Sequence, residues 1–319
     1  MPRFDVTTIG EASLRMSVPI GMRLETARQF DVHIAGAEAN VTGALSRLRW
    51  QCGWVSRLPD TPIGYRVRQS FTSAGLDLSA VNWTDDGNLA SLYVEYADAP
   101  RVTQVFFNRK HSCFTRMKAE QVDWSYLLDT RLLHLTGITT ALSPSCENIV
   151  AEATRLAREK NVPISFDVNY RKKLWSIERA REALLPMIQD VDLLFCSERD
   201  AQKVFGCDGA LRGKISQLTE QCNAKKIVMS RGDAGLTGYD GEMFITEDAV
   251  NVKILDRIGA GDALAAGVIH GWLQGDFAKG LRYGVTMAAL ALSQYGDMVI
   301  TSSQELEALI KQTYDGIER

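Results

Sequence analysis

Short apolar segments alternate with helix-patterned segments through most of this sequence, and this alternation constrains the fold more than any other feature. Helical spacing is found at 37–50, at 65–75 and after Ser143–Pro144, which has the pattern of an N-cap followed by a first-turn proline. Such alternation is typical of an α/β fold with a doubly wound, mostly parallel sheet covered by helices on both faces. The predicted strands are 4–10, 52–58, 131–137, 163–168, 191–197 and 225–230.

One region departs from this alternation. Residues 89–97 and 102–110 are both strand-like, and the turn-like segment DAPR joins them. We predict an antiparallel hairpin there. A hairpin inserted in an α/β domain is a candidate lid over a site at the carboxyl edge of the sheet, since insertions often carry function. An extension of the sheet edge or a dimer contact are the alternatives.

The composition, the net charge and the cysteine and histidine counts exclude several classes of protein. The 319 residues are 45% hydrophobic and 24% charged, as in ordinary globular proteins, and the net charge of −3 gives no reason to expect nucleic acid or an anionic membrane as partner. No apolar run approaches the roughly 20 residues of a membrane helix, and the first residues lack the apolar core of a signal peptide. The six scattered cysteines predict reduced, mostly buried thiols in a cytoplasmic protein, and the four histidines show no zinc spacing.

The stretch DRIGAGDALAAG, residues 256–267, is the strongest functional signal. A strand-like segment, 251–255, precedes it and a helix-like segment follows, so GAGD is predicted at a helix N-terminus after a strand. The amides of residues 259–262 then have no intrahelical partner, and together with the helix dipole they favour an anion. A dinucleotide fingerprint or a simple packing turn are the alternatives, and the chain has no GxxxxGK[ST] phosphate loop.

Asp262 directly follows this glycine turn. A carboxylate beside an anion site repels its ligand unless it has another task, and general base for an attacking hydroxyl is a task that fits. Asp262 could equally complement the helix dipole alone. Spacing leaves these two interpretations open.

Several motifs extend this signal to a family. DRIGAGDALAAG resembles the C-terminal signature of the ribokinase-like (pfkB) carbohydrate kinases, and AGAEANVTGALSRL, residues 35–48, resembles their N-terminal signature. LHLTGITTALSP, SFDVNYRKKLW and VDLLFCSERDAQKVFG resemble the 2-keto-3-deoxygluconate kinase branch. The resemblance covers nearly the whole chain. It implies one ribokinase-like αβα sandwich over residues 1–319, with a small β-strand lid formed by about 12–34 and 88–113.

The resemblance also implies an activity and its site. It implies ATP-dependent phosphorylation of a sugar-acid hydroxyl with Mg²⁺, and a candidate K⁺ site. Asp262 matches the general base, Gly259, Ala260 and Gly261 match the anion hole, and Arg171 matches a residue that reaches substrate and phosphate. The positions that match substrate contacts are Gly36, Asn40, Tyr93, Phe107, Arg109, Arg171, Asp262 and Asp297. Those that match nucleotide contacts are Asn169, Ser197, Ser230, Arg231, Gly232, Gly235 and the anion-hole residues. Asp200 matches a magnesium position that acts through water, and Asp256 a monovalent-cation position.

The residue types suit these roles but have simpler explanations as well. Arg109 and Arg171 carry planar guanidinium groups that fit a carboxylate or a phosphate, although surface ion pairs use the same groups. Tyr93 could be a cross-strand packing residue, and Gly36 and Asn40 could be an ordinary helix start.

Departures from the family pattern leave the substrate open. Arg257 and Ile258 stand where threonines are common, and Ser197 stands where the family's magnesium-organising element has Asn. The alternatives are a kinase for a neutral sugar such as fructose or ribose, a sugar-binding protein without turnover and, least suited to the motif, a dehydrogenase. The exposed edge of a hairpin lid predicts a homodimer or a higher homo-oligomer formed through the lid.

Overall fold

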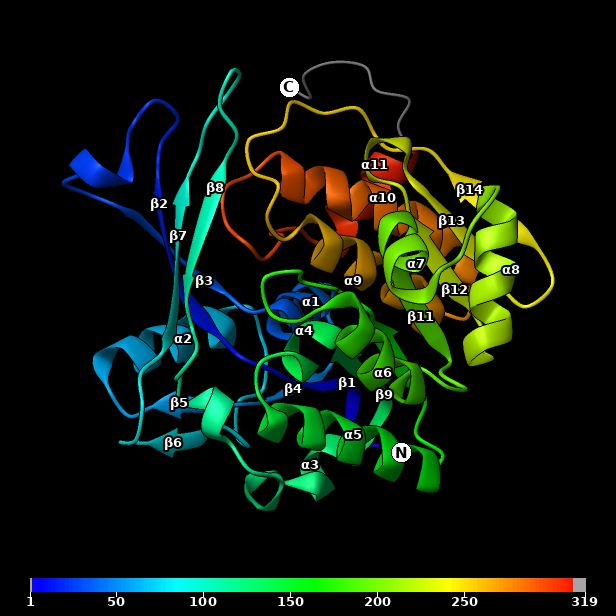
Figure 1. The fold of residues 1–319 in the computed structure, drawn as a ribbon, viewed down its shortest axis with the longest axis horizontal. Helices are drawn as coiled ribbons and strands as arrows, with labels where there is room; N and C mark the ends of the chain where they lie inside the picture. Colours follow the sequence, from blue (N-terminus) through cyan, green and yellow to red (C-terminus); the bar gives the residue numbers. More distant parts are fainter. Residues whose placement is uncertain (1, 312–319) are drawn as a thin grey trace.

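The main sheet has eight strands in the order β14-β13-β12-β11-β10-β9-β1-β4, in a computed structural model that describes residues 2–311 (Figure 1). The six strands from β12 to β4 are parallel, whereas β13 and β14 are antiparallel. The predicted doubly wound, mostly parallel sheet is therefore confirmed. The strands are β1 (Phe4–Ile9), β4 (Cys52–Val55), β9 (Thr130–Thr136), β10 (Ile164–Asp167), β11 (Leu193–Ser197), β12 (Ile227–Ser230), β13 (Leu236–Tyr239) and β14 (Phe244–Glu247).

Helices cover both faces of this sheet, because successive strand residues point to opposite sides. Leu194 belongs to one hydrophobic core, and its neighbours Leu193 and Phe195 belong to the other. The first core is completed by α3 (Trp124–Leu128), α5 (Pro144–Glu159), α6 (Ile177–Met187), α7 (Glu198–Phe205) and α8 (Leu211–Cys222). The second is completed by α1 (Ala37–Arg47), α2 (Pro62–Ser73), α9 (Ala260–Leu273), α10 (Phe277–Leu292) and α11 (Ser303–Lys311). The short α4 (Gly137–Thr140) follows β9.

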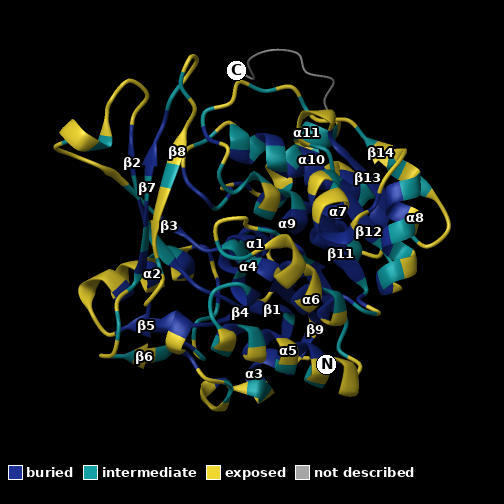
Figure 2. Cartoon of the chain, viewed as in Figure 1, coloured by how far each residue is buried: buried dark blue, intermediate teal, exposed yellow. Residues whose placement is uncertain are grey.

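A second sheet of four strands extends from one side of this sandwich, on the left in Figure 1. Its order is β3-β2-β7-β8, with β2 (Ser13–Val18), β3 (Asp31–Ala35), β7 (Ala90–Glu95) and β8 (Gln104–Asn108). The predicted hairpin is confirmed, since β7 and β8 pair antiparallel. Both segments expected to form a lid contribute strands to this sheet. Its outermost strand, β8, is mostly exposed, whereas β7 is largely buried (Figure 2).

Two expectations about strands were wrong. Residues 251–255 form no strand: most of them are exposed, and the amide of Leu255 donates to the carbonyl of Leu292 at the end of α10 (2.8 Å) instead of to a neighbouring strand. The segment 52–58 is divided between β4 and β5 (Arg57–Pro59), and β5 pairs with β6 (Asn82–Thr84) in a separate two-stranded sheet. Elsewhere the local signals held: the Ser143 hydroxyl caps α5 by accepting from the amide of Cys146 (3.1 Å).

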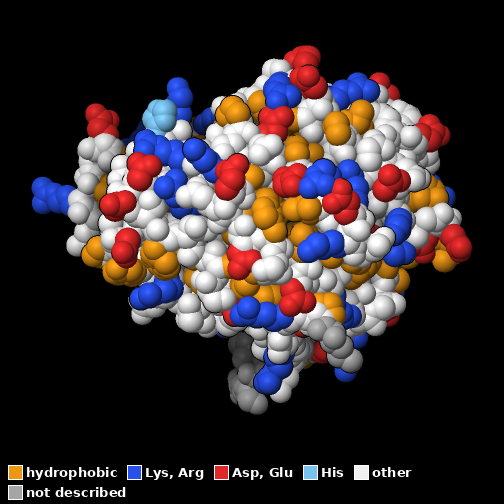
Figure 3. Space-filling view, turned by 90° about the horizontal axis from the view of Figure 1, so that it is seen from below, with side chains coloured by type: hydrophobic (Ala, Val, Ile, Leu, Met, Phe, Trp, Pro, Cys, Tyr) orange, Lys and Arg blue, Asp and Glu red, His pale blue; other side chains and the backbone are white. Residues whose placement is uncertain are grey.

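The structure also bears on the predicted state of the cysteines, on the presence of membrane-spanning helices and on the charge of the surface. All six cysteines are free and buried, as predicted. No helix within residues 2–311 is both long and apolar enough to span a bilayer. On the face seen in Figure 3, cationic and anionic side chains are interspersed, with hydrophobic side chains between them.

Candidate active site

Several candidate site residues, predicted or newly found, lie at one edge of the main sheet. Asp167 ends β10, Ser197 ends β11 and Ser230 ends β12, and these strands run parallel. Parallel strands bring their carboxyl ends to the same edge, which is where open α/β sheets bind ligands. Segments separated by long stretches of sequence therefore form one candidate site.

The glycine turn before α9 has a closed side and an open side. Gly259 has φ of 86°, and a Cβ at this position would lie 1.9 Å from the carbonyl oxygen of Asp297. A Cβ on Gly261 would meet nothing within 4 Å. No side chain within the described residues caps the start of α9. The first amides of α9 are thus uncapped by a side chain, and the space beside Gly261 is open, which leaves room for the predicted anion hole.

Asp262, in the first turn of α9, contacts the first turn of α1. The Asn40 side-chain amide donates to Asp262 Oδ2 (2.7 Å), whereas the buried Asn40 Oδ1 has no partner among the described residues. Burial raises the pKa of Asp262 to about 8; the Asn40 hydrogen bond opposes the rise, Asp167 adds to it, Arg171 opposes it and Asp297 adds to it. A carboxyl group that titrates near neutral pH suits proton transfer.

Asp256 and Asp297 share a buried partner that the sequence analysis missed. Arg15, on β2, forms ion pairs with both carboxylates and is fully buried. Burial raises the pKa of Asp297 to about 6, and the charge of Arg15 opposes the rise. Asp256, the predicted monovalent-cation residue, therefore lies against a guanidinium group. The inward-facing arginine of the strand SLRMSV was the available signal, but its partners are 241 and 282 residues away in sequence.

Asp200 fits the predicted magnesium role. It is 7% exposed, and burial raises its pKa. Its Oδ1 accepts no hydrogen bond from the described residues, and Arg199 Nε lies 4.0 Å from it. The Ser197 hydroxyl is engaged, because it accepts from the Asp200 amide as the cap of α7 (3.0 Å). No three acidic, histidine or cysteine side chains within residues 2–311 gather as a metal cage. A magnesium ion here would therefore keep water and phosphate oxygens as ligands, as that ion prefers.

Asp167 is a further acidic group that the sequence analysis passed over within DVNYR. Burial raises its pKa to about 7, and the charge of Arg171 opposes the rise. Asn169 follows in a left-handed conformation, with φ of 41°, and its amide donates to Asp167 Oδ1 (3.1 Å). The exposed Arg171 is therefore close to Asp167, Asp200 and Asp262, each of whose pKa values its charge lowers.

The predicted nucleotide loop is a tight turn after β12. The Arg231 amide donates to the carbonyl of Gly235 (2.8 Å), and Gly232 begins the 3₁₀ turn between them. Gly235 has φ of 84°, and a Cβ there would lie 2.1 Å from the carbonyl oxygen of Glu247. The Arg231 side chain leaves Nε and Nη2 buried without partners among the described residues. These two unpaired donors suit a phosphate.

The second sheet separates the predicted lid contacts. Leu92 lies directly opposite Phe107, and Tyr93 lies directly opposite Phe106. Directly opposed residues share a face and adjacent residues do not. The structure therefore does not bring Tyr93 together with Phe107 and Arg109, because Tyr93 lies on the other face of the sheet and packs edge-on against Phe30 with ring centroids 6.4 Å apart.

Arg109 is already paired. Its Nε and Nη2 donate to Glu11 Oε2 (2.9 and 2.6 Å), and its guanidinium lies 5.6 Å from the ring centroid of Phe107. Glu11, which the sequence analysis missed, is 5% exposed and follows β1. Gly36 packs close by: a Cβ on it would lie 2.9 Å from the Glu11 carbonyl oxygen. The Gly36 backbone therefore leaves no room for a side chain.

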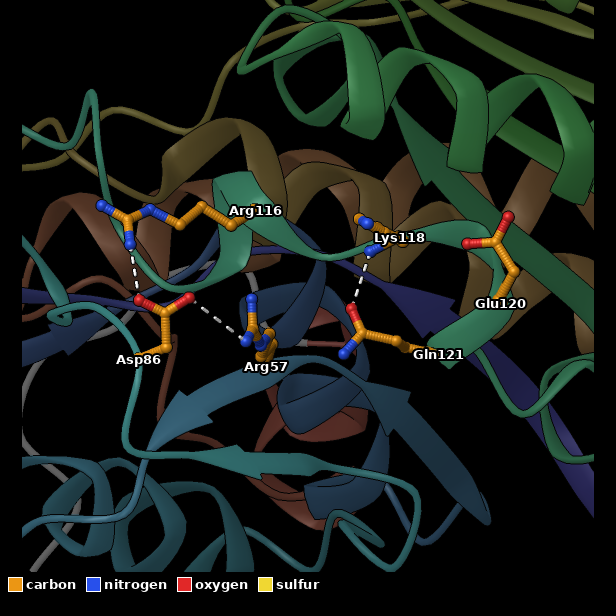
Figure 4. A pocket seen from close by; sticks show the side chains of 6 residues that line it. All are labelled: Arg57, Asp86, Arg116, Lys118, Glu120 and Gln121. Atoms are coloured by element: carbon orange, nitrogen blue, oxygen red, sulfur yellow. Dashed lines mark hydrogen bonds and ion pairs between the residues drawn. The ribbon is translucent and has the colours of Figure 1, made fainter.

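An open pocket lies elsewhere, among β5, β6 and the turns after β8 (Figure 4). In it Arg116 donates to Asp86 (2.6 Å), and Arg57 lies 3.8 Å from the same carboxylate. None of the predicted site residues lines this pocket. Its full lining is Arg57, Asp86, Arg116, Lys118, Glu120 and Gln121.

Known proteins match both the sequence and the fold. Residues 5–304 match the profile of the pfkB family carbohydrate kinases. A 2-dehydro-3-deoxygalactonokinase from Haloferax volcanii is 33% identical over 316 residues, covering 99% of this chain and 99% of that protein. The 2-dehydro-3-deoxygluconokinase from Thermotoga maritima superposes with a TM-score of 0.92 at 28% identity, covering 97% of this chain and 98% of that one.

A further solved structure agrees in fold. An E. coli protein in complex with ATP and Mg²⁺ superposes with a TM-score of 0.88 at 24% identity, covering 97% of this chain and 99% of that one. At this identity the similarity supports the fold alone.

Proposed function

We propose that this chain, which belongs to the pfkB family of carbohydrate kinases, transfers the terminal phosphoryl group of ATP to a hydroxyl of a 2-keto-3-deoxy sugar acid. The substrate is 2-keto-3-deoxygluconate, which would become the 6-phosphate, or its galactonate epimer. The names of the Haloferax and Thermotoga relatives support this substrate class. The observation that carries the mechanism is the meeting of Asn40 and Asp262 beside the open start of α9.

Asp262 acts as the general base. It takes the proton of the substrate hydroxyl, and the resulting oxygen attacks the terminal phosphorus. The amides of residues 259–262 stabilise the negative charge on the transferred group, because they are fixed before the reaction begins. Arg171 adds a positive charge beside the same carboxylate, as its effect on the pKa of Asp262 indicates.

The nucleotide is held on the other side of the anion hole. ATP supplies the phosphoryl group, and Mg²⁺ offsets the charge of its phosphates when bound. Asp200 would hold the ion through water, and its Oδ1, which accepts no hydrogen bond from the described residues, supports this role. Asn169, Ser197 and the loop of Ser230, Arg231, Gly232 and Gly235 would contact the nucleotide, and the two unpaired Arg231 donors support a phosphate contact.

The chain forms a single kinase domain, and the second sheet acts as a lid over its active site. Its inner face carries Phe107 and Arg109 toward the site, and the Lys173 ammonium group, from the segment after β10, donates to the carbonyl of Val105 on β8 (3.0 Å). Gly36, Asn40 and Asp297 complete the sugar side. A closed lid would exclude water and limit loss of ATP to hydrolysis.

The outer face of the lid pairs two copies of the chain. Register places Met16, Val32, Tyr93 and Phe106 side by side there. Phe30, which packs against Tyr93, is 38% exposed, and Phe106 is 49% exposed. An apolar face of this kind favours burial against a second copy. Light scattering should report a homo-oligomer that the change Phe106→Asp dissociates; a monomeric wild type would contradict this.

One observation favours a second candidate, a kinase for a neutral sugar. Glu11 already pairs with Arg109, which leaves the Arg109 guanidinium less available for a substrate carboxylate. Arg109→Ala separates the two candidates. For an acidic substrate it should raise KM by on the order of tenfold or more, as loss of a charge-assisted hydrogen bond does, and for a neutral sugar it should change KM little.

The direct test is release of ADP with Mg-ATP. The panel contains 2-keto-3-deoxygluconate, 2-keto-3-deoxygalactonate, fructose, ribose and a blank without sugar. Release with the keto-deoxy acids alone is expected. Release with a neutral sugar alone would keep the mechanism and reject the substrate class. Binding of ATP and sugar without ADP release would reject catalysis.

The location follows from the thiols. Six unpaired buried cysteines support a reducing compartment, and we place the protein in the cytoplasm on that basis.

A further inference from the structure

We infer that Arg15 is a positioning residue for phosphoryl transfer, a fixed internal cation that holds the anion-hole turn in place and makes an added monovalent ion unnecessary. The inference rests on the proposed kinase function for its kinetic part. It concerns a residue of the second sheet that would not contact the reacting atoms.

Arg15 joins two carboxylates in the protein interior. Its Nη1 donates to Asp297 Oδ2 (2.9 Å), and its Nη2 forms a short ion pair with Asp256 Oδ2. The Tyr96 hydroxyl donates to the same Asp256 oxygen (2.6 Å), and the Tyr96 ring centroid lies 5.5 Å from the guanidinium carbon. The side chain of Arg15 is fully buried, as is that of Asp256. Because these groups are buried, removing one charge would leave its partner as an uncompensated buried charge, which is strongly destabilising.

Both aspartates contact the anion-hole turn, Asp256 through its carboxylate and Asp297 through its backbone carbonyl. Asp256 Oδ1 accepts from the amide of Ile258 (3.0 Å), one residue before Gly259. The backbone carbonyl oxygen of Asp297 lies 1.9 Å from the position that a Cβ of Gly259 would take. A shift of either aspartate would therefore displace the turn that presents the amides of residues 259–262. Misplacement of about 1 Å near a reacting group can cost on the order of 100-fold in rate.

The same geometry bears on the predicted monovalent-cation site. Both oxygens of Asp256 are engaged, one by Arg15 and Tyr96 and the other by the Ile258 amide. The guanidinium supplies the positive charge that a bound ion would bring. Removal of the guanidinium would leave two buried carboxylates around a space that a small cation can enter.

The first test uses the unaltered protein. Its kcat is measured at equal ionic strength in potassium chloride and in tetramethylammonium chloride. Equal rates are expected. Activation of the wild type by K⁺ of several-fold would overturn the proposal whatever the variants do.

The second test is Arg15→Met with added guanidinium or K⁺. We expect kcat to fall at least about tenfold, because the turn is displaced, and either cation to restore part of it. Arg15→Lys should retain an intermediate kcat, since one ammonium group can reach one carboxylate well. The matched control is Arg101→Met, whose arginine pairs with Glu95 on the same sheet (3.1 Å) but is partly exposed. The control should keep the wild-type kcat and show no response to either cation.

Thermal unfolding without substrate separates this proposal from the kinase proposal. Guanidinium should raise the unfolding temperature of Arg15→Met and should not raise that of the wild type, on which it acts only as a denaturant, even if no sugar is phosphorylated. A wild type that is folded but turns over no sugar would reject the kinase function alone. Wild-type kcat in Arg15→Met, or a loss that neither cation reverses, would overturn the role of Arg15.

Discussion

Asp256 and Asp262 lie on the two sides of one glycine turn. The side-chain partner of Asp256 is a cation, whereas the hydrogen-bond partner of Asp262 is a neutral amide. Asp256 is fully buried and paired with the guanidinium of Arg15. Asp262 is partly exposed, and its hydrogen-bond partner is the neutral amide of Asn40. Desolvation favours the neutral form of a carboxyl group, and at Asp262 it outweighs the opposing effects of the Asn40 hydrogen bond and the charge of Arg171.

This difference supports the proposed division between a structural carboxylate, Asp256, and a reactive one, Asp262. The pKa of Asp262 rises to about 8, mainly by burial. The arginine on the closed side holds the turn, and the neutral amide on the open side orients a group that can still accept a proton. Two aspartates six residues apart in sequence thus receive different tasks from their surroundings.

The largest effect should come from removing the reactive carboxylate. Asp262→Asn should lower kcat by about 10²–10⁴-fold, the usual contribution of a positioned base. Steady-state release of ADP measures it. Asp98→Asn, at an exposed loop position, is the matched control. A folded Asp262→Asn protein that keeps kcat within a few-fold of wild type would show that Asp262 is not the reactive carboxylate of the turn.

The two glycines of the turn should respond in opposite ways. Gly261→Ala places a methyl group in open space at the anion hole, so we expect kcat to fall on the order of tenfold or more. Its unfolding temperature should rise or hold, since Ala favours a helix over Gly by about 1 kcal/mol. Gly259→Ala should lower the unfolding temperature, because Gly259 has φ of 86° and packs against the Asp297 carbonyl. Equal thermal effects of the two changes would contradict the distinction between a closed and an open side.

Asn40 should set the pH at which Asp262 becomes active. Its hydrogen bond lowers the pKa of Asp262, so Asn40→Ala should raise it. The rising limb of kcat/KM should move to higher pH by on the order of one unit, the value of a hydrogen bond to a charged group. Asn148→Ala, an exposed position on α5, serves as control. An unchanged limb in Asn40→Ala would exclude this role.

A smaller effect concerns stability. The ordinary pKa of 3.8 applies to Asp262 in the unfolded chain, whereas the folded value is about 8. The folded protein thus binds more protons between these pH values, and its free energy of unfolding falls as pH rises through this window. Asp262→Asn should lack this contribution, so its stability relative to wild type should increase from pH 5 to pH 8 in urea unfolding. A constant difference would indicate an unshifted carboxyl group.

Local patterns predicted most of this architecture. The strand and helix spacing gave the parallel sheet, and GAGD placed Asp262 at the start of a helix. The segment 251–255 misled because short apolar runs are ambiguous: it extends along the end of α10 without forming a strand.

The site was less accessible from sequence, because its geometry depends on distant contacts. Arg15 pairs with two carboxylates that are far away in the sequence, and the local sequence SLRMSV does not indicate which carboxylates these are. Strand register determines which face of the second sheet each predicted lid residue occupies. Tyr93 lies opposite Phe106 and therefore on the other face from Phe107. A shift of one residue reverses the face of a strand residue, and sequence alone does not specify it.

The most direct test of the account is the pH dependence of kcat/KM for the sugar acid, measured for wild type and Asp262→Asn. We predict that kcat/KM of the wild type rises with pH, with an apparent pKa of about 8, since a base must lose its proton before it can act. The residual rate of Asp262→Asn should lack this limb. A wild-type profile that is level across this range, or the same limb in Asp262→Asn, would contradict the assignment of Asp262 as the base.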